Sequence, residues 1–343
     1  MQLRISLVSQ FEQQQAETWA LAFASDGKRL VSSDGNALYL WQLDETGNWD
    51  YERALPFRKA TFPHFAPDGT MLAFGSPEPS IKLISLDGEE VATFPCPAHA
   101  SWAFSPDQRW LVSTSSKREI LLWDLVTYQS SSIALPFPAF ARWKTKEDLS
   151  NERVGCFLFT PDGQQLVFGA SSSQGYIHLC FFDPEHRRIT QHTTFPVEGM
   201  LAGSISPDGK KLAMVIAHEQ DAAYQQEVSV YDLASLQLLQ VFPQVADDRY
   251  CLLAFSPDSQ YLASCKDDGW VDLFSLVSFE RVAQFAAHPG LSSHATDPIG
   301  GFDWSSTGYL ATGGASVFAQ DMKRVDSTIK LWKIREEYGG SSL

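Results

Sequence analysis

Residues 103–125, AFSPDQRWLVSTSSKREILLWDL, combine a tight turn with three short segments of strand-like sequence. In the turn, SPDQ at 105–108, the proline fixes φ at the first central position, and the Ser and Asp side chains can bond nearby backbone amides. The apolar run after the turn and the segment 120–125 are typical of a second and a third strand. The stretch therefore predicts a hairpin followed by a third strand ending in Trp-Asp.

The same turn signal occurs seven times, at intervals of 39 to 55 residues. The copies begin at Ala24, Ala66, Ser105, Thr160, Ser206, Ser256 and Ser305. The predicted third strands are LYLWQL (38–43), IKLISL (81–86), ILLWDL (120–125), IHLCFF (177–182), VSVYDL (228–233), VDLFSL (271–276) and IKLWKI (329–334). Repeats of this length are typical of arrays of small antiparallel units, and no stretch has a sustained helical period. The chain is therefore predicted to be all-β.

Through AFSPD, LLWDL and VSVYDL, the chain resembles the WD-repeat (WD40) family of β-propellers over nearly its whole length. The resemblance implies a seven-bladed β-propeller of four-stranded antiparallel blades. The family's Trp-Asp pair is intact only at Trp123-Asp124, with Tyr231-Asp232 close to it, and its Gly-His element occurs as Ala98-His99 and Ala287-His288. We therefore expect most blades to lack the family's buried His-Ser-Asp-Trp network and to rely on apolar packing. Aromatic wedges between blades are expected at Phe23, Phe65, Phe104, Phe159, Phe255 and Trp304.

Closure of the ring is predicted from the two ends of the chain. The last repeat supplies only three strands, whereas residues 3–11, LRISLVSQF, alternate apolar and polar side chains ahead of the first repeat. We predict that this segment is the outer strand of the seventh blade, which leaves no large sheet edge open. The end-to-end repeat predicts one domain at 1–337, with residues 1–12 closing the seventh blade and a flexible tail at 338–343.

The composition bounds the partners and the compartment. A formal charge of −15 and a pI near 4.9 disfavour nucleic acid and an anionic membrane surface. The acid excess either keeps the protein soluble or faces a basic partner. The sequence has no secretory signal and no apolar run near the roughly 20 residues that span a bilayer. Five cysteines without a CxxC motif are typical of reduced core thiols, which predicts a cytoplasmic protein.

Loop lengths point to one face of the predicted propeller. In the WD-repeat arrangement, loops between second and third strands share a face with the connections between blades. The spacing from second to third strand is 16 residues in blade five and 19 in blade seven, against 8 to 11 elsewhere, and the connections 135–155 and 286–301 are also long. All four insertions belong to that face, which we interpret as a binding surface over the channel mouth. Tolerated drift of loop length is the alternative.

Aromatic and charged residues of these insertions are the binding candidates, because interface hot spots favour Trp, Tyr and Arg. They are Arg142, Trp143, Lys144, His218, Tyr224, His294, Phe318, Lys323 and Arg324. Alternatively, the aromatic members fix their own loops onto the blades, and the charged members are simply solvated.

Catalytic motifs are missing from the sequence. It has no GxSxG, HExxH, GxxxxGK[ST] or GxGxxG, and its eight histidines show no i,i+2 or i,i+4 pair. His64 and Asp303 occupy a first-strand position where other blades have small or apolar residues, so both could reach the channel wall. They are either a metal or catalytic pair or two polar residues in contact with water. We predict no catalytic residue, no bound metal and no cofactor.

The function predicted from these observations is a non-enzymatic scaffold that binds a protein or peptide on the loop-rich face. The partner is basic if the acid excess of this chain faces it. We expect a monomer or a member of a hetero-complex, with no nucleic-acid or membrane partner. Two alternatives remain. One is a propeller enzyme of the metal-dependent hydrolase or lactonase type, with its site at the central channel. The other is the sensor domain of a larger signalling protein.

Overall fold

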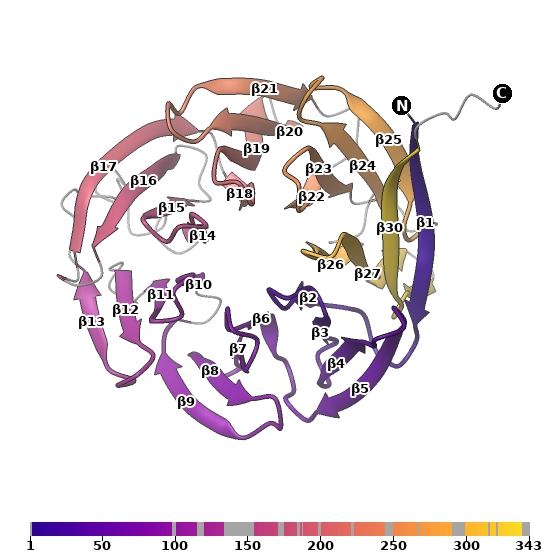
Figure 1. Cartoon of the computed structure of the whole chain (residues 1–343), viewed down its shortest axis with the longest axis horizontal. Helices are drawn as coiled ribbons and strands as arrows, with labels where there is room; N and C mark the ends of the chain where they lie inside the picture. Colours follow the sequence, from indigo (N-terminus) through magenta and orange to yellow (C-terminus); the bar gives the residue numbers. More distant parts are fainter. Residues whose placement is uncertain are drawn as a thin grey trace. The chain divides into compact units, whose positions relative to one another are not determined.

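A computed structural model describes most of the chain. The described residues are 2–97, 101–114, 120–133, 154–170, 175–183, 186, 188–197, 200–220, 223–243, 250–266, 268–289, 299–314, 316–319 and 322–337. Every regular element among them is a strand, and the strands form seven four-stranded antiparallel sheets and one two-stranded sheet (Figure 1). The predicted fold class, a seven-bladed β-propeller of four-stranded antiparallel blades, is confirmed.

The blades are numbered in chain order. Blade one is β2 (Ala20–Phe23), β3 (Arg29–Ser33), β4 (Leu38–Leu43) and β5 (Trp49–Leu55); blade two is β6 (Thr61–Phe65), β7 (Met71–Gly75), β8 (Ser80–Ser85) and β9 (Glu90–Pro95). Blade three is β10 (Trp102–Phe104), β11 (Trp110–Thr114), β12 (Ile120–Asp124) and β13 (Ser130–Ile133); blade four is β14 (Val154–Phe159), β15 (Gln165–Ala170), β16 (Gly175–Asp183) and β17 (Arg188–Val197). Blade five is β18 (Met200–Ile205), β19 (Lys211–Gln220), β20 (Ala223–Asp232) and β21 (Leu238–Pro243); blade six is β22 (Tyr250–Phe255), β23 (Tyr261–Lys266), β24 (Trp270–Ser275) and β25 (Arg281–Ala286). Blade seven is β26 (Ile299–Trp304), β27 (Tyr309–Gly314), β30 (Ile329–Glu337) and β1 (Gln2–Phe11), and β28 (Ser316–Ala319) pairs with β29 (Met322–Val325).

The chain divides into two compact units. One contains Met1–Phe65, Leu72–Phe74 and Val245–Leu343, and the other contains Ala66–Met71 and Gly75–Gln244. The single domain at 1–337 and the tail at 338–343 stay predictions, and the tail lies outside the described residues.

The seven turns share one geometry, which explains the repeated composition. In each, the amide of the fourth residue donates to the carbonyl of the first, as Gly163 does to Thr160 at 2.8 Å. Where the first residue is Ser or Thr, its hydroxyl accepts the amide that opens the second strand, as in Lys211 N to Ser206 Oγ. Where the third residue is Asp, its carboxylate can accept the amide two residues on, as in Lys210 N to Asp208 Oδ1. The fourth residue has φ between 59° and 82° in all seven turns. Glycine reaches this region without strain, and Gln108 and Ser259 occupy it at a cost.

The closing strand is where the sequence predicted it. β1 pairs antiparallel with β30 from Gln2 opposite Glu337 to Phe11 opposite Ile329, with a bulge between Leu7 and Ser9. The first and last strands therefore lie side by side along their length (Figure 1). This confirms that the N-terminal segment completes blade seven.

The apolar cores lie between neighbouring sheets. In the first unit, one cluster joins blades seven and one around Trp41, and another joins blades six and seven around Leu310. In the second unit, the clusters join blades three and four and blades four and five. Among the first-strand aromatics, Phe65 and Phe255 are buried. The others are partly buried, and Phe23, Phe159 and Trp304 pack against these clusters, as wedges should.

The insertions of blades five and seven are strands, where the sequence predicted loops. In blade five, β19 and β20 continue as a ribbon past Ile216, with pairs from Ala217–Gln226 to Gln220–Ala223, a projection of about 13 Å. In blade seven, β28 and β29 pair only with each other. A two-stranded ribbon satisfies its own backbone hydrogen bonds, which a long irregular loop cannot do.

Candidate functional site

The insertion residues predicted to bind a partner fall into two groups. Arg142, Trp143, Lys144 and His294 lie outside the described residues. The others lie on the two ribbons, where His218 pairs with Gln225, Tyr224 with Glu219, Phe318 with Lys323 and Arg324 with Val317. The register thus brings Phe318, Lys323 and Arg324 together at one end of blade seven. Their role in binding stays a prediction.

Asp303 and His64 belong to the inner strands β26 and β6. The half-buried Asp303 carboxylate accepts the amides of Phe23 and Trp304, each at 2.8 Å, and so joins blade seven to blade one. Desolvation nevertheless dominates and raises its pKa to about 6. Water reaches the His64 ring, yet the protein around the ring desolvates it enough to lower its pKa to about 4, so it is neutral at pH 7. The arrangement gives Asp303 a structural role.

A groove on blade one is a candidate site. Its volume is about 480 Å³, within the range of small binding clefts. The groove lies at the end of the sheet opposite the SPDG-type turn, where the chain enters β2, turns from β3 to β4 and leaves β5. The lining residues are Gln13, Gln15, Asn36, Ala37, Tyr39, Tyr51, Ala54, Pro56 and Arg58.

Buried Asp34 fixes the walls of this groove. Its carboxylate accepts the amides of Gln15, Ala16, Asn36 and Ala37 and the Tyr39 hydroxyl, at 2.8 to 3.2 Å. These five donors satisfy the two carboxylate oxygens of Asp34. They connect the segment before β2, the β3–β4 turn and Tyr39, whose side chain forms the floor of the groove. Burial, followed by the hydrogen bond to Asp34, raises the pKa of Tyr39 to about 12, so the floor stays neutral.

Trp19, Gly35 and Lys59 are neighbours, in sequence or by contact, of residues at this end of blade one. Trp19, 38% exposed, packs so closely on Gly35 that a Cβ there would lie 2.7 Å from its ring. The Gly35 carbonyl accepts the Lys59 amide at 2.8 Å, and Lys59 has a positive φ of 55°. We call Gln13, Gln15, Trp19, Asn36, Tyr51, Arg58 and Lys59 the blade-one strip.

The blade-one strip carries two adjacent cations in an acidic chain, and one carboxylate borders it, because Glu17 accepts the Trp19 indole N–H at 3.3 Å. Arg58 and Lys59 are exposed, and neither has an acidic partner among the described residues. No residue that lines the groove carries a carboxylate. The sequence prediction did not include the strip because it rested on long insertions, and the connection 56–60 is short. Adjacent Arg and Lys in a chain of charge −15 were the available signal.

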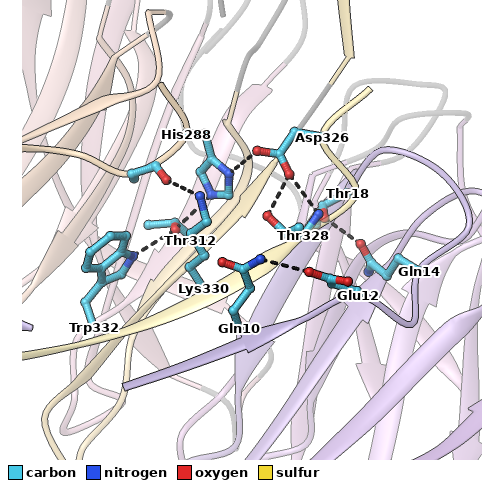
Figure 2. A network of polar contacts seen from close by, with 11 residues as sticks. Gln10, Glu12, Gln14, Thr18, His288, Thr312, Asp326, Thr328, Lys330 and Trp332 are labelled. Atoms are coloured by element: carbon cyan, nitrogen blue, oxygen red, sulfur yellow. Dashed lines mark hydrogen bonds and ion pairs between the residues drawn. The ribbon is translucent and has the colours of Figure 1, made fainter. Parts of the chain in front are cut away.

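Two blades of the first unit contain related buried polar networks. In blade seven, His288 contacts Asp326 through Nδ1 at 2.8 Å and Thr312 through Nε2 at 3.0 Å, and Trp332 donates to Thr312 (Figure 2). In blade one, Gln14 and Trp41 both donate to Ser32. Blade three has the corresponding bond from Trp123 to Ser113. Blade seven therefore has a network of the His-Ser-Asp-Trp type with Thr312 in place of Ser, and the expectation that most blades lack one stays a prediction.

The described part of the chain has neither a metal-binding cluster nor a membrane-spanning helix. It holds no group of three or more His, Cys, Asp or Glu side chains arranged to bind a metal ion. It also contains no helix with the length and hydrophobicity needed to cross a bilayer.

Comparisons with known proteins agree with the fold. The WD domain, G-beta repeat family matches residues 88–124 and 246–275, in the region of blades three and six. "Protein hir1" of Aspergillus terreus is 24% identical over 134 residues, which cover 36% of this chain and 13% of that protein. "Apoptotic protease-activating factor 1" of Danio rerio is 22% identical over 167 residues, 47% of this chain and 12% of that protein. The chain thus spans about an eighth of the length of these relatives. The repeat matches and the seven four-stranded sheets together support the WD40-repeat family of β-propellers as the family of this chain.

Proposed function

We propose that the chain is a non-enzymatic interaction platform that binds a protein or peptide at the blade ends opposite the SPDG-type turns. WD40 propellers typically serve as protein-interaction scaffolds. One observation carries the choice of ends: every SPDG-type turn has the same short geometry, whereas, among the described residues, the ribbon of blade five, the β28–β29 ribbon and the blade-one groove each lie at the opposite end of their own blade.

Charge and thiols support further parts of the proposal. A charge of −15 favours a partner that is basic over most of its contact surface, because like charges across an interface are costly. The blade-one strip is a local exception. A reducing cytoplasmic setting is supported by Cys96, Cys180 and Cys265, which are buried and free. Burial raises the pKa of Cys96 to about 11 and that of Cys180 to about 12, so both stay protonated and unreactive.

Site-specific photo-crosslinking in cells of the source organism tests this proposal. A benzophenone amino acid replaces Asn36 or Lys323 at the ends with the groove or a ribbon, or exposed Lys28 or Lys210 at the turn ends. The expected result is one common crosslinked partner from positions 36 and 323, with little from 28 and 210. Equal or stronger crosslinking from positions 28 and 210 would contradict the proposal.

A further inference from the structure

We propose that the blade-one strip binds an extended acidic peptide segment of the partner, with carboxylates on either side of an apolar side chain. This inference rests on the proposed function and adds the chemistry of one site. Arg58 and Lys59 supply the charge, three amide side chains supply hydrogen bonds, and Trp19 and Tyr51 supply exposed aromatic surface.

The cations are presented by backbone geometry. Lys59 donates its amide hydrogen to the Gly35 carbonyl and has a left-handed backbone conformation, which costs roughly 1–2 kcal/mol for a residue with a Cβ. Such strain at an exposed position is typical of functional sites. Elsewhere in this unit, exposed Arg4 and Arg53 have acidic partners within 3.1 Å. Arg58 and Lys59 are thus available to a carboxylate from outside.

The neutral side chains suit a peptide backbone. Gln13, Gln15 and Asn36 each offer a donor and an acceptor, the pair of groups that an extended chain presents at each residue. Tyr51 is 43% exposed, and its ring meets Trp41 edge-on at 5.5 Å, so it is anchored on one side and open on the other. An anchored aromatic ring loses little side-chain entropy on binding, which favours it as a contact for an apolar side chain.

The limited extent of positive charge favours a peptide over nucleic acid. At physiological salt, charges act over about 8 Å, so two cations can hold one or two carboxylates despite the net charge of −15. A nucleic acid would continue past the strip with a phosphate at every nucleotide and meet the acidic remainder of the surface. A short acidic peptide segment need not extend past the two cations, so it avoids repulsion from the acidic surface around them.

Fluorescence anisotropy with defined peptide pools tests the inference on the full chain. The acidic pool is Gly-Gly-Glu-Xaa-Xaa-Glu-Gly-Gly with Leu, Phe, Tyr or Pro at Xaa, and the matched basic pool has Lys in place of Glu. The acidic pool should bind the wild type, and the double variant Arg58→Glu, Lys59→Glu should bind it at least tenfold more weakly. The control Arg53→Glu changes a neighbouring β5 cation that already faces Glu52, and should stay within twofold.

A second variant separates the aromatic contact from charge. Tyr51→Ala should weaken binding of the acidic pool severalfold without making it more sensitive to salt, and its melting temperature should stay near that of the wild type. Loss of folding in the double variant would show as a shifted melt. In that case, Tyr51→Ala and the single variant Arg58→Gln decide the question.

Several outcomes would overturn the inference. They are no binding of the acidic pool at millimolar peptide, tighter binding of the basic pool, equal binding by the charge-reversed variant, and displacement of the acidic pool by oligo-dT at equal charge. Crosslinking from positions 36 and 323 without peptide binding would overturn this inference alone. Crosslinking mainly from 28 and 210 would overturn the proposed function, whatever the peptides do.

Discussion

Blades one and seven build similar buried networks from different chemistry. In blade one, an amide completes the network: Gln14 donates to Ser32 at 2.8 Å and accepts from Thr18 at 2.6 Å. In blade seven, His288 takes that place and faces the Asp326 carboxylate. Blade one keeps its own carboxylate, Asp34, for backbone amides and Tyr39. The geometry of the network therefore does not require an ionisable pair, but its response to pH does depend on one.

The electrostatic difference is visible at Asp326. Burial by itself would raise the pKa of this carboxyl, but the hydrogen bond and charge of His288 and the bonds from Thr328 together hold it well below the ordinary value of 3.8. Asp326 also closes the base of the β28–β29 ribbon, where Gly314 donates to Thr328. Acid should therefore act on blade seven before it acts on the amide network of blade one.

The largest difference should come from truncating the two tryptophans. Trp41 is fully buried and stacks on Phe11 at 4.3 Å, whereas Trp332 is only partly buried. Trp41→Ala should cost about 4 kcal/mol and Trp332→Ala about 2 kcal/mol, because the first leaves a larger cavity. Urea unfolding followed by circular dichroism measures both. Equal costs would mean that the two blades are equally well packed around their networks.

The second test converts blade seven into the blade-one type. His288→Gln should cost about 2 kcal/mol at pH 7, since Asp326 loses its partner. The reverse change, Gln14→His, places an imidazole where Thr18 and Ser32 offer no carboxylate. Thermal melting of both variants and the double swap shows whether each network tolerates the other's residue. A stabilised His288→Gln variant would contradict the importance of the pair.

Acid unfolding tests how the stability of blade seven changes with pH. Because the pKa of Asp326 is lowered in the folded state, its contribution is present above the unfolded value and is lost as the pH falls below about 4. Asp326→Asn should therefore be less stable at pH 7 and lose less stability between pH 4 and 2. Asp303 has the opposite sign: its raised pKa of about 6 makes stability fall as the pH rises from about 4 to 6. Other carboxyls with a lowered pKa, such as Asp124 and Asp208, also act below pH 4, so the difference between Asp326→Asn and the wild type in that range isolates Asp326.

Much of this architecture was predictable, for local reasons. The seven turns encode their own hydrogen bonds in three or four residues, and the alternation of 3–11 encodes an unpaired strand. The amide network was not predictable, because Gln14 matches no family motif and acts through Ser32, 18 residues away. The groove also needs distant parts of blade one, with Gln13 and Arg58 brought together only by folding. Ribbons in place of loops depend on pairing within the insertions, which loop length alone does not reveal.

Glycine substitutions in the SPDG-type turns of blades one and seven should have smaller effects on stability. A Cβ on Gly27 would lie 2.8 Å from the Thr307 amide nitrogen, while one on Gly308 would meet only the flexible Lys333 amine at 3.5 Å. Both have positive φ. Gly27→Ala should cost about 2 kcal/mol and Gly308→Ala about 1 kcal/mol, because only the first adds a backbone clash between the blades. Paired thermal melts decide whether the blade-one turn is the tighter of the two.

The smallest effect is expected on the outside of blade seven. Arg4 and Glu337 form a 3.0 Å ion pair between β1 and β30, but both side chains are more than half exposed. Arg4→Ala should change the free energy of unfolding by less than about 0.5 kcal/mol. A larger loss in the same urea assay would show that closure depends on surface charge as well as on the strand pairing.

Pairing of the first strand with the last fixes the order of events during synthesis. β1 is synthesised before the other strands of the propeller, but its partner is encoded more than 300 residues later. At roughly 5–20 residues per second, the strand waits on the order of 15–60 s with an open edge. Exposed Leu7 and Val8 make that edge attractive to other nascent chains, and Arg4 is the only charge along its length. During translation, β1 of each new chain can therefore pair either with its own β30, once that strand is made, or with a strand of a neighbouring new chain on the same mRNA.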